Sequence, residues 1–166
     1  MHLTQKERSL LKDMQSHESI CIAKYNNYAQ QAQDPQLQQL FNSYAQKEQQ
    51  HYDTLDQLLQ GQVPDMAQNQ GQNQGQDQLS NQAQSRWTAQ MNSPSTQTGL
   101  VNESDALLCS DALMTEKYVS GAYDTVVFEA ANPTVRQVVQ HIQDEEQQHG
   151  EGIFNYMSEH GMYQVR

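Results

Sequence analysis

The chain is poor in basic residues. It has 9 lysines and arginines against 20 aspartates and glutamates, which gives a formal net charge of -11 over 166 residues. Nucleic acids and anionic membranes bind basic surfaces, so we expect neither as a partner. An acidic chain instead collects cations or carries a solvated acidic surface, and the composition leaves both open. The length indicates a single domain spanning 1–166.

Cysteines and long apolar runs are also scarce. Cys21 and Cys109 are too few for a disulfide framework, and both fall in helical sequence, so we expect reduced core residues. No apolar run approaches the roughly 18 residues that a membrane span needs. The first eight residues lack the apolar segment of a secretory signal, which predicts synthesis in the cytoplasm without a secretion signal.

The few prolines and glycines divide the chain. Pro35 and Pro133 each follow a capping residue, as at the start of a helix, while Gly61 and Gly161 are typical helix ends. The sequence thus predicts two helical hairpins, with helices over about 4–33, 35–60, 103–131 and 133–160.

The segment between the hairpins, about 62–102, is of low complexity and rich in Gln, Asn and Gly, which predicts a flexible crossover linker. Within it an apolar residue recurs every four positions, at Leu79, Ala83, Trp87 and Met91. A short amphipathic helix and a transient helix in a loop both fit this pattern.

The two hairpins are an internal repeat. A shift of 98 positions superposes their landmarks without a gap: Glu18 on Glu116, Tyr25 on Tyr123, Pro35 on Pro133, Glu48 on Glu146 and His51 on His149. Such a repeat predicts a four-helix bundle made of two antiparallel hairpins packed head to tail. The second and third helices then run parallel, and a flexible linker of about 40 residues reaches the roughly 35 Å that separates their ends.

Each helix has an apolar seam whose spacings alternate between three and four residues, as in a left-handed bundle. Every seam is interrupted at one level by a glutamate. In two of the helices a histidine follows this glutamate three residues later. Each glutamate lies roughly 21–24 Å from its hairpin turn, so all four meet in one central layer. The interrupting residues are Glu18, Glu48, His51, Glu116, Glu146 and His149.

No lysine or arginine occupies a seam position, so four carboxylates would be buried without a basic partner. Two divalent ions would neutralise them, and two Glu plus two Glu-x-x-His pairs are the ligand set of di-iron and di-manganese carboxylate bundles. Iron or manganese is expected, with zinc as an alternative. The competing interpretation is a metal-free hydrogen-bonded layer.

Several neighbours of the seam bear on this layer. Tyr25 and Tyr123 are either core filler or hydrogen-bond donors to the ligands. Polar residues beside the motifs lie off the seam and are expected to be solvated: His17, Lys47, Lys117 and Glu145.

Several segments resemble the spore coat protein F family of the ferritin-like superfamily. In the first hairpin they are 3–14 with His17 and Glu18, 34–40 and 47–52, and the second hairpin is similar around 105–108 and 145–149. The resemblance implies a ferritin-like bundle in which the six seam residues are metal ligands. It also implies synthesis in the mother-cell cytoplasm, deposition in the spore coat, and other coat proteins or the chain itself as partners.

Three functions fit these observations. The first is a structural coat component with a di-metal site. The second is a di-iron or di-manganese redox enzyme that acts on peroxide or dioxygen. The third is a metal-free interaction protein with a vestigial site. The sequence leaves open whether a reaction is catalysed.

Overall fold

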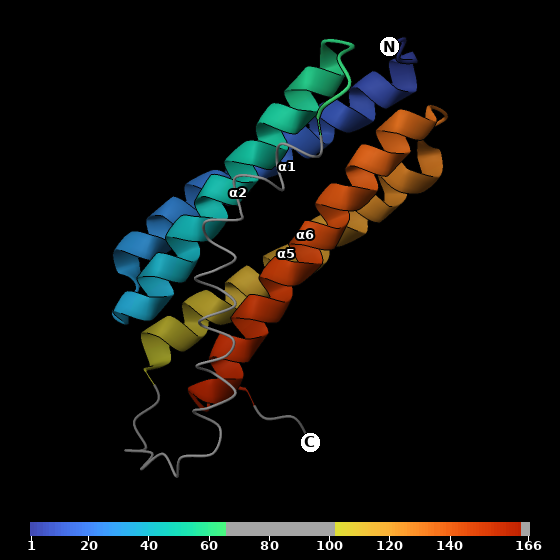
Figure 1. The fold of residues 1–166 in the computed structure, drawn as a ribbon. Coiled ribbons are helices and arrows are strands. Elements are labelled where there is room, and N and C mark those ends of the chain that lie inside the picture. The colour runs from blue at the N-terminus through green and yellow to red at the C-terminus, as the bar shows by residue number, and fades with distance from the viewer. Residues whose placement is uncertain (66–101, 164–166) are drawn as a thin grey trace. The chain divides into compact units, whose positions relative to one another are not determined.

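The computed structural model describes residues 1–65 and 102–163, which form four α-helices paired as two antiparallel hairpins (Figure 1). The first hairpin consists of α1 (Gln5–Gln31) and α2 (Pro35–Leu59), and the second of α5 (Glu103–Glu129) and α6 (Pro133–Glu159). The described ranges contain no strand. The predicted all-α bundle of two hairpins is confirmed, whereas a single domain spanning 1–166 stays a prediction. None of the described helices is long and apolar enough to cross a membrane.

Local sequence sets the ends of these helices. The side chains of Asp34 and Asn132 accept hydrogen bonds from backbone N–H groups in the first turns of α2 and α6, and a proline follows each cap. Past the other ends, Gly61 and Gly161 adopt φ values of 81° and 69°, a left-handed conformation that glycine accepts without steric cost. The two glycines predicted to end the second helix of each hairpin therefore lie where the chain leaves the helix.

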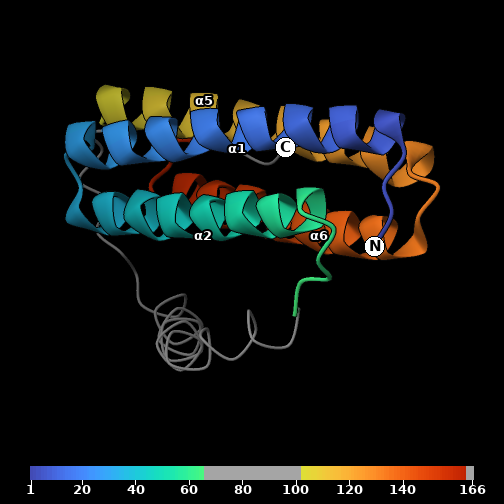
Figure 2. The same ribbon diagram turned by 90° about the horizontal axis from the view of Figure 1, so that it is seen from above.

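The hairpins pack with α1 beside α5 and α2 beside α6 (Figure 2). Because α2 and α5 run in the same direction, α2 ends and α5 begins at opposite ends of the bundle. A crossover rather than a short loop therefore joins the hairpins, as the repeat predicts. The predicted linker, about 62–102, lies almost wholly outside the described residues, and so do Leu79, Ala83, Trp87 and Met91.

The predicted seams form the core. All seam residues are buried except Tyr28 and Tyr44, which are half-buried. Cys21 and Cys109 are buried free thiols, as expected. Since each large apolar side chain contributes about 1.5–3 kcal/mol on full burial, the seams are the main source of stability for the helix pairs.

Two further buried carboxylates connect the hairpins at their ends. Glu7 on α1 accepts a hydrogen bond of 2.7 Å from the backbone N–H of Asn132, in the turn of the other hairpin. Asp105 on α5 accepts bonds of 2.9 and 3.0 Å from the backbone N–H groups of Gln33 and Asp34. Glu7 and Asp105 are themselves 98 positions apart, so each hairpin turn is held by the first turn of the opposite hairpin.

Candidate metal centre

The six residues that interrupt the seams meet in one buried layer, to which every helix contributes. Glu18 comes from α1 and Glu116 from α5, while α2 and α6 each supply a Glu-x-x-His pair. None of the six is more than 5% exposed. The structure therefore brings together the whole set that the sequence predicts as metal ligands.

The layer divides into two overlapping groups. In each group one ligand atom from every residue lies within 4.8 Å of the others. Glu48 and Glu146 belong to both groups, so they stand between the two halves of the layer. The first half adds Glu18 and His51, and the second adds Glu116 and His149.

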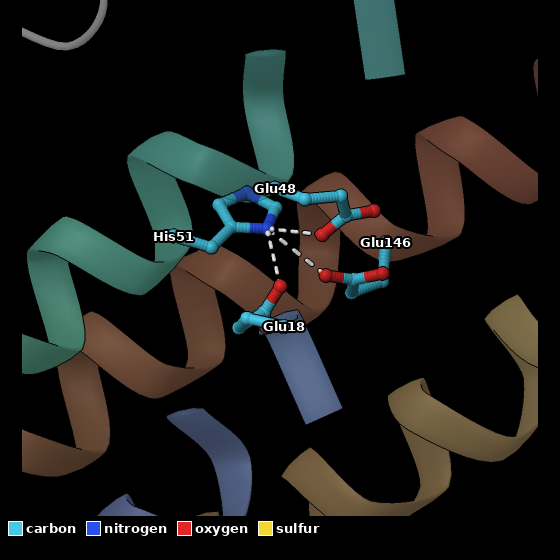
Figure 3. Close-up of side chains that lie close together, drawn as sticks. All are labelled: Glu18, Glu48, His51 and Glu146. Carbon is cyan, nitrogen blue, oxygen red and sulfur yellow. Dashed lines mark hydrogen bonds and ion pairs between the residues drawn. The ribbon is translucent and has the colours of Figure 1, made fainter. Parts of the chain in front are cut away.

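Each imidazole directs its Nδ1 atom toward the shared carboxylates. His51 Nδ1 lies 3.1 Å from Glu48 Oε2, 3.0 Å from Glu146 Oε1 and 3.8 Å from Glu18 Oε2 (Figure 3). In the other half, His149 Nδ1 lies 3.1 Å from Glu48 Oε1 and 3.8 Å from Glu116 Oε2. Each imidazole thus lies 3.1 Å from Glu48 and 3.8 Å from its unshared glutamate, with Glu48 using a different oxygen on each side. Glu146 lies nearer to His51 than to His149, whose Nδ1 is 4.0 Å from Glu146 Oε2.

Burial sets the protonation of the carboxyls. It raises the pKa of Glu18 to about 8, that of Glu116 to about 10 and that of Glu146 to about 7. Burial also opposes ionisation of Glu48, but hydrogen bonds from both histidines hold its pKa well below its usual range. The metal-free layer therefore holds protons at neutral pH on Glu18 and Glu116, while Glu48 is ionised.

The layer fits a metal centre better than a closed hydrogen-bonded network. Three buried carboxylate oxygens have no hydrogen-bond partner among the described residues: Glu18 Oε2, Glu116 Oε2 and Glu146 Oε2. A fourth, Glu146 Oε1, meets only the His51 Nδ1 atom that is already directed at Glu48. Buried polar atoms are nearly always paired, so oxygens left over in one place call for a cation. Carboxylate oxygen and imidazole nitrogen together suit iron, manganese and zinc.

Two tyrosines donate to the unshared glutamates, which decides between the two roles open for them. The hydroxyl of Tyr25 on α1 donates to Glu116 Oε1 on α5, and that of Tyr123 on α5 donates to Glu18 Oε1 on α1. One oxygen of each glutamate is thus held from the opposite hairpin, and its other oxygen is one of the unpaired atoms. This arrangement leaves one oxygen of each glutamate for an ion.

The expectation that Lys47 and Glu145 are solvated is wrong. Glu145 Oε2 lies 2.9 Å from His51 Nε2, and Glu145 Oε1 lies 2.8 Å from Lys47 Nζ. Both side chains are 15% exposed. Burial raises the pKa of Glu145, but the hydrogen bond from His51 and the ammonium of Lys47 outweigh it and bring that pKa to about 2. Seam spacing could not find this contact, since it joins residues of different helices. The feature of the sequence that could have indicated this role of Glu145 is its position directly before the candidate ligand Glu146.

Residues 104–166 match the family model of the Coat F domain. This part of the chain is therefore similar to a Coat F domain. Its range contains Glu116, Glu146 and His149, half of the buried layer, and it covers almost all of the second hairpin. The resemblance to the spore coat F family is therefore confirmed, and a Coat F domain indicates a role in the spore coat.

Among solved structures, the chain is similar to a two-domain protein from Anabaena variabilis that contains DJ-1/ThiJ/PfpI-like and ferritin-like domains. The TM-score is 0.67 at 11% identity, and the match covers 99% of this chain and 40% of that one. At this identity the likeness shows the fold, which is ferritin-like. The chain spans less than half of the length of that protein. No curated protein matches it in sequence.

Proposed function

We propose that this Coat F protein is a spore coat component whose ferritin-like bundle holds two divalent metal ions. The observation that carries the proposal is the set of unpaired carboxylate oxygens on Glu18, Glu116 and Glu146, which face two imidazoles in a buried layer. One ion would be held by Glu18, Glu48, His51 and Glu146. The other would be held by Glu48, Glu116, Glu146 and His149.

The first role of such ions is structural. Each ion would take ligands from both hairpins, so it would join them at the middle of the bundle as Glu7 and Asp105 do at the ends. Ligands that bind only the folded state raise its stability, and ions would also remove the repulsion among the four carboxylates. Metal would therefore make the bundle more durable, as a coat component needs to be.

Elemental analysis and cell fractionation test this proposal. Protein purified without chelator should contain about two equivalents of iron, manganese or zinc per chain, and chelation should lower its melting temperature. The protein should be found in spore coat extracts, made in the mother-cell cytoplasm and absent from vegetative cells. A chain that takes up no divalent ion, aerobically or anaerobically, would support a metal-free interaction protein with a vestigial site.

A redox enzyme is the second candidate. Glu48 and Glu146 each belong to both ligand groups, so two ions would share ligands and lie close together, as two-metal catalysis requires. Bound iron or manganese would supply one-electron chemistry toward peroxide or dioxygen. Peroxide consumption by the metal-loaded protein, compared with the Glu48→Ala variant, separates this candidate from the structural role.

The proposed partners are other spore coat proteins, the chain itself among them. Large apolar side chains stand exposed along α5 at Leu107, Met114, Tyr118 and Phe128, with exposed fractions from 67% to 83%. Large apolar side chains that stay exposed on one helix can serve as contacts to another protein. Chemical cross-linking in isolated coats, followed by mass spectrometry of the attached peptides, would identify the chains that touch α5.

A further inference from the structure

The six candidate ligands are identical at positions related by the shift of 98, but the residues that surround them differ between the two hairpins. Positions related by the shift of 98 carry different residues beside the layer: Tyr44 and Ile142, Lys47 and Glu145, and Thr54 and Gly152. The two halves therefore offer an ion the same ligand atoms in two different environments.

In the first half, a carboxylate orients the histidine. His51 Nε2 lies 2.9 Å from Glu145 Oε2, which as a carboxylate can only accept, so Nε2 keeps its proton and Nδ1 is the nitrogen that can exchange its proton for an ion. With that proton replaced, the lone pair of Nδ1 faces the carboxylates of Glu18, Glu48 and Glu146, which are the other ligands of this half. Lys47 fixes the other oxygen of Glu145 at 2.8 Å, and a carboxylate that holds a histidine in this way also makes it a better metal ligand.

In the second half, the repeat places Lys47 where a carboxylate would have to be. An ammonium cannot accept a hydrogen bond, and Lys47 is already paired with Glu145. For His149 Nε2 no hydrogen-bond partner occurs in the described part of the chain. No carboxylate therefore holds His149 from its Nε2 side, as Glu145 holds His51.

Ring packing takes the place of that carboxylate. The ring of Tyr44 lies against the imidazole of His149, with 4.3 Å between centroids and a 30° angle between planes. Gly152 makes room for it, because a Cβ atom there would overlap the Tyr44 hydroxyl and would lie 3.3 Å from Cζ. In the other half the corresponding pair is Ile142 and Thr54, so Tyr44 and Gly152 are a matched pair built into one half only.

We propose that the two halves bind divalent ions with unequal affinity: the Glu18–His51 half fills first and tightly, and the Glu116–His149 half fills second and exchanges more readily. Glu145 is the positioning residue that creates the difference. This inference rests on the proposed metal site and adds an order of filling to it.

Titration of the metal-free protein with Mn²⁺, with the free ion counted by electron paramagnetic resonance, tests the order. We expect two phases of one equivalent each. Glu116→Gln should keep the tight phase and lose the weak one, and Glu18→Gln should do the reverse. Both changes preserve side-chain size and an acceptor for the donating tyrosine, so they remove little except the charged ligand.

Glu145→Gln isolates the positioning effect. It should weaken the tight phase about 10–100-fold, as is common for partners of ligating histidines, and leave the weak phase unchanged. Asp144→Asn is the matched control, because it neutralises the neighbouring acidic residue, which is exposed, and it should change neither phase. Lys47→Gln breaks only the ion pair with Glu145, so it should weaken the tight phase much less than Glu145→Gln does.

The combined change Lys47→Glu and Glu145→Lys should reverse the order, so that the tight phase then survives Glu18→Gln and not Glu116→Gln. Two equal phases in the wild type, or equal effects of Glu18→Gln and Glu116→Gln, would overturn the inequality while leaving the metal site standing. Absence of Mn²⁺ and Zn²⁺ uptake in a folded wild type would overturn the site itself and the inequality with it.

Discussion

Tyr123 on α5 donates a hydrogen bond to Glu18 on α1, across the interface between the two hairpins. Tyr25 on α1 returns the same contact to Glu116 on α5. Each hairpin thereby supplies the donor that orients the other hairpin's unshared glutamate. The central layer is consequently assembled from both hairpins at the level of its supporting residues as well as its candidate ligands.

Removing either donor should weaken the bundle. Tyr123→Phe leaves Glu18 Oε1 buried without its donor, which should cost about 1–3 kcal/mol in the free energy of unfolding of the metal-free protein. Tyr25→Phe should cost a similar amount, because its contact is the repeat-related equivalent. Urea unfolding checks both, with Tyr118→Phe as the control at a position that is 68% exposed. Losses no larger than that of the control would show that these bonds do not hold the layer.

The metal-free protein should lose stability as the pH rises. The folded pKa values of Glu146, Glu18 and Glu116 are raised to about 7, 8 and 10, whereas an unfolded glutamate titrates near its model value of 4.5. Their contribution is therefore fully present below about pH 4.5 and declines as the pH rises through the folded values. Melting temperatures of the chelator-treated protein between pH 5 and 9 should fall steadily.

Bound ions should oppose this fall of the melting temperature with rising pH, because they ligate the ionised carboxylates and displace protons. The increase in melting temperature on adding Mn²⁺ should be larger at pH 8 than at pH 5.5. An increase that does not depend on pH would argue against binding at these carboxylates.

Neutralising Glu116 and neutralising Glu48 should change the stability of the metal-free protein in opposite directions. Glu116→Gln removes a carboxyl that must hold a proton in the folded state, so it should stabilise the metal-free protein at pH 8 and have little effect at pH 4.5. Glu48→Gln removes a charge and leaves a single side-chain acceptor for two imidazoles, so it should destabilise the protein at pH 8. Thermal unfolding of the two isosteric variants makes the comparison, and effects of equal sign would contradict the protonation pattern derived above.

The carboxylates at the ends of the bundle should stabilise the fold independently of bound metal. Asp105→Asn leaves a single side-chain acceptor for the two backbone donors of Gln33 and Asp34, and should cost about 1–3 kcal/mol in the free energy of unfolding. Asp124→Asn, on the exposed face of the same helix, is the control and should change little. Mn²⁺ uptake per folded chain should stay at its wild-type value in both variants. Loss of uptake in Asp105→Asn alone would show that the ends and the middle of the bundle are coupled.

The sequence predicted those features that depend on one helix at a time. Seam periodicity and the shift of 98 gave the hairpins, the core and the level of Glu18, Glu48, Glu116 and Glu146. Contacts between helices that involve residues off the seams could not be predicted in this way. Glu145 follows its seam by one position and reads as solvated until α2 brings His51 against it. Glu7 and Asp105 read as ordinary acidic residues of a first turn, because their partners are backbone groups in the opposite hairpin.

The cross-hairpin contacts have a consequence for how the protein is divided. Neither hairpin supplies the side-chain acceptor for the free backbone N–H groups of its own turn. Neither orients its own unshared glutamate or completes a ligand group from its own side chains. Residues 1–64 and 102–166, produced as two separate polypeptides, should therefore find each other and rebuild the layer, whereas either one alone has an incomplete centre. Divalent ions would take ligands from both fragments and so hold them together, and metal uptake would report that the two fragments have associated.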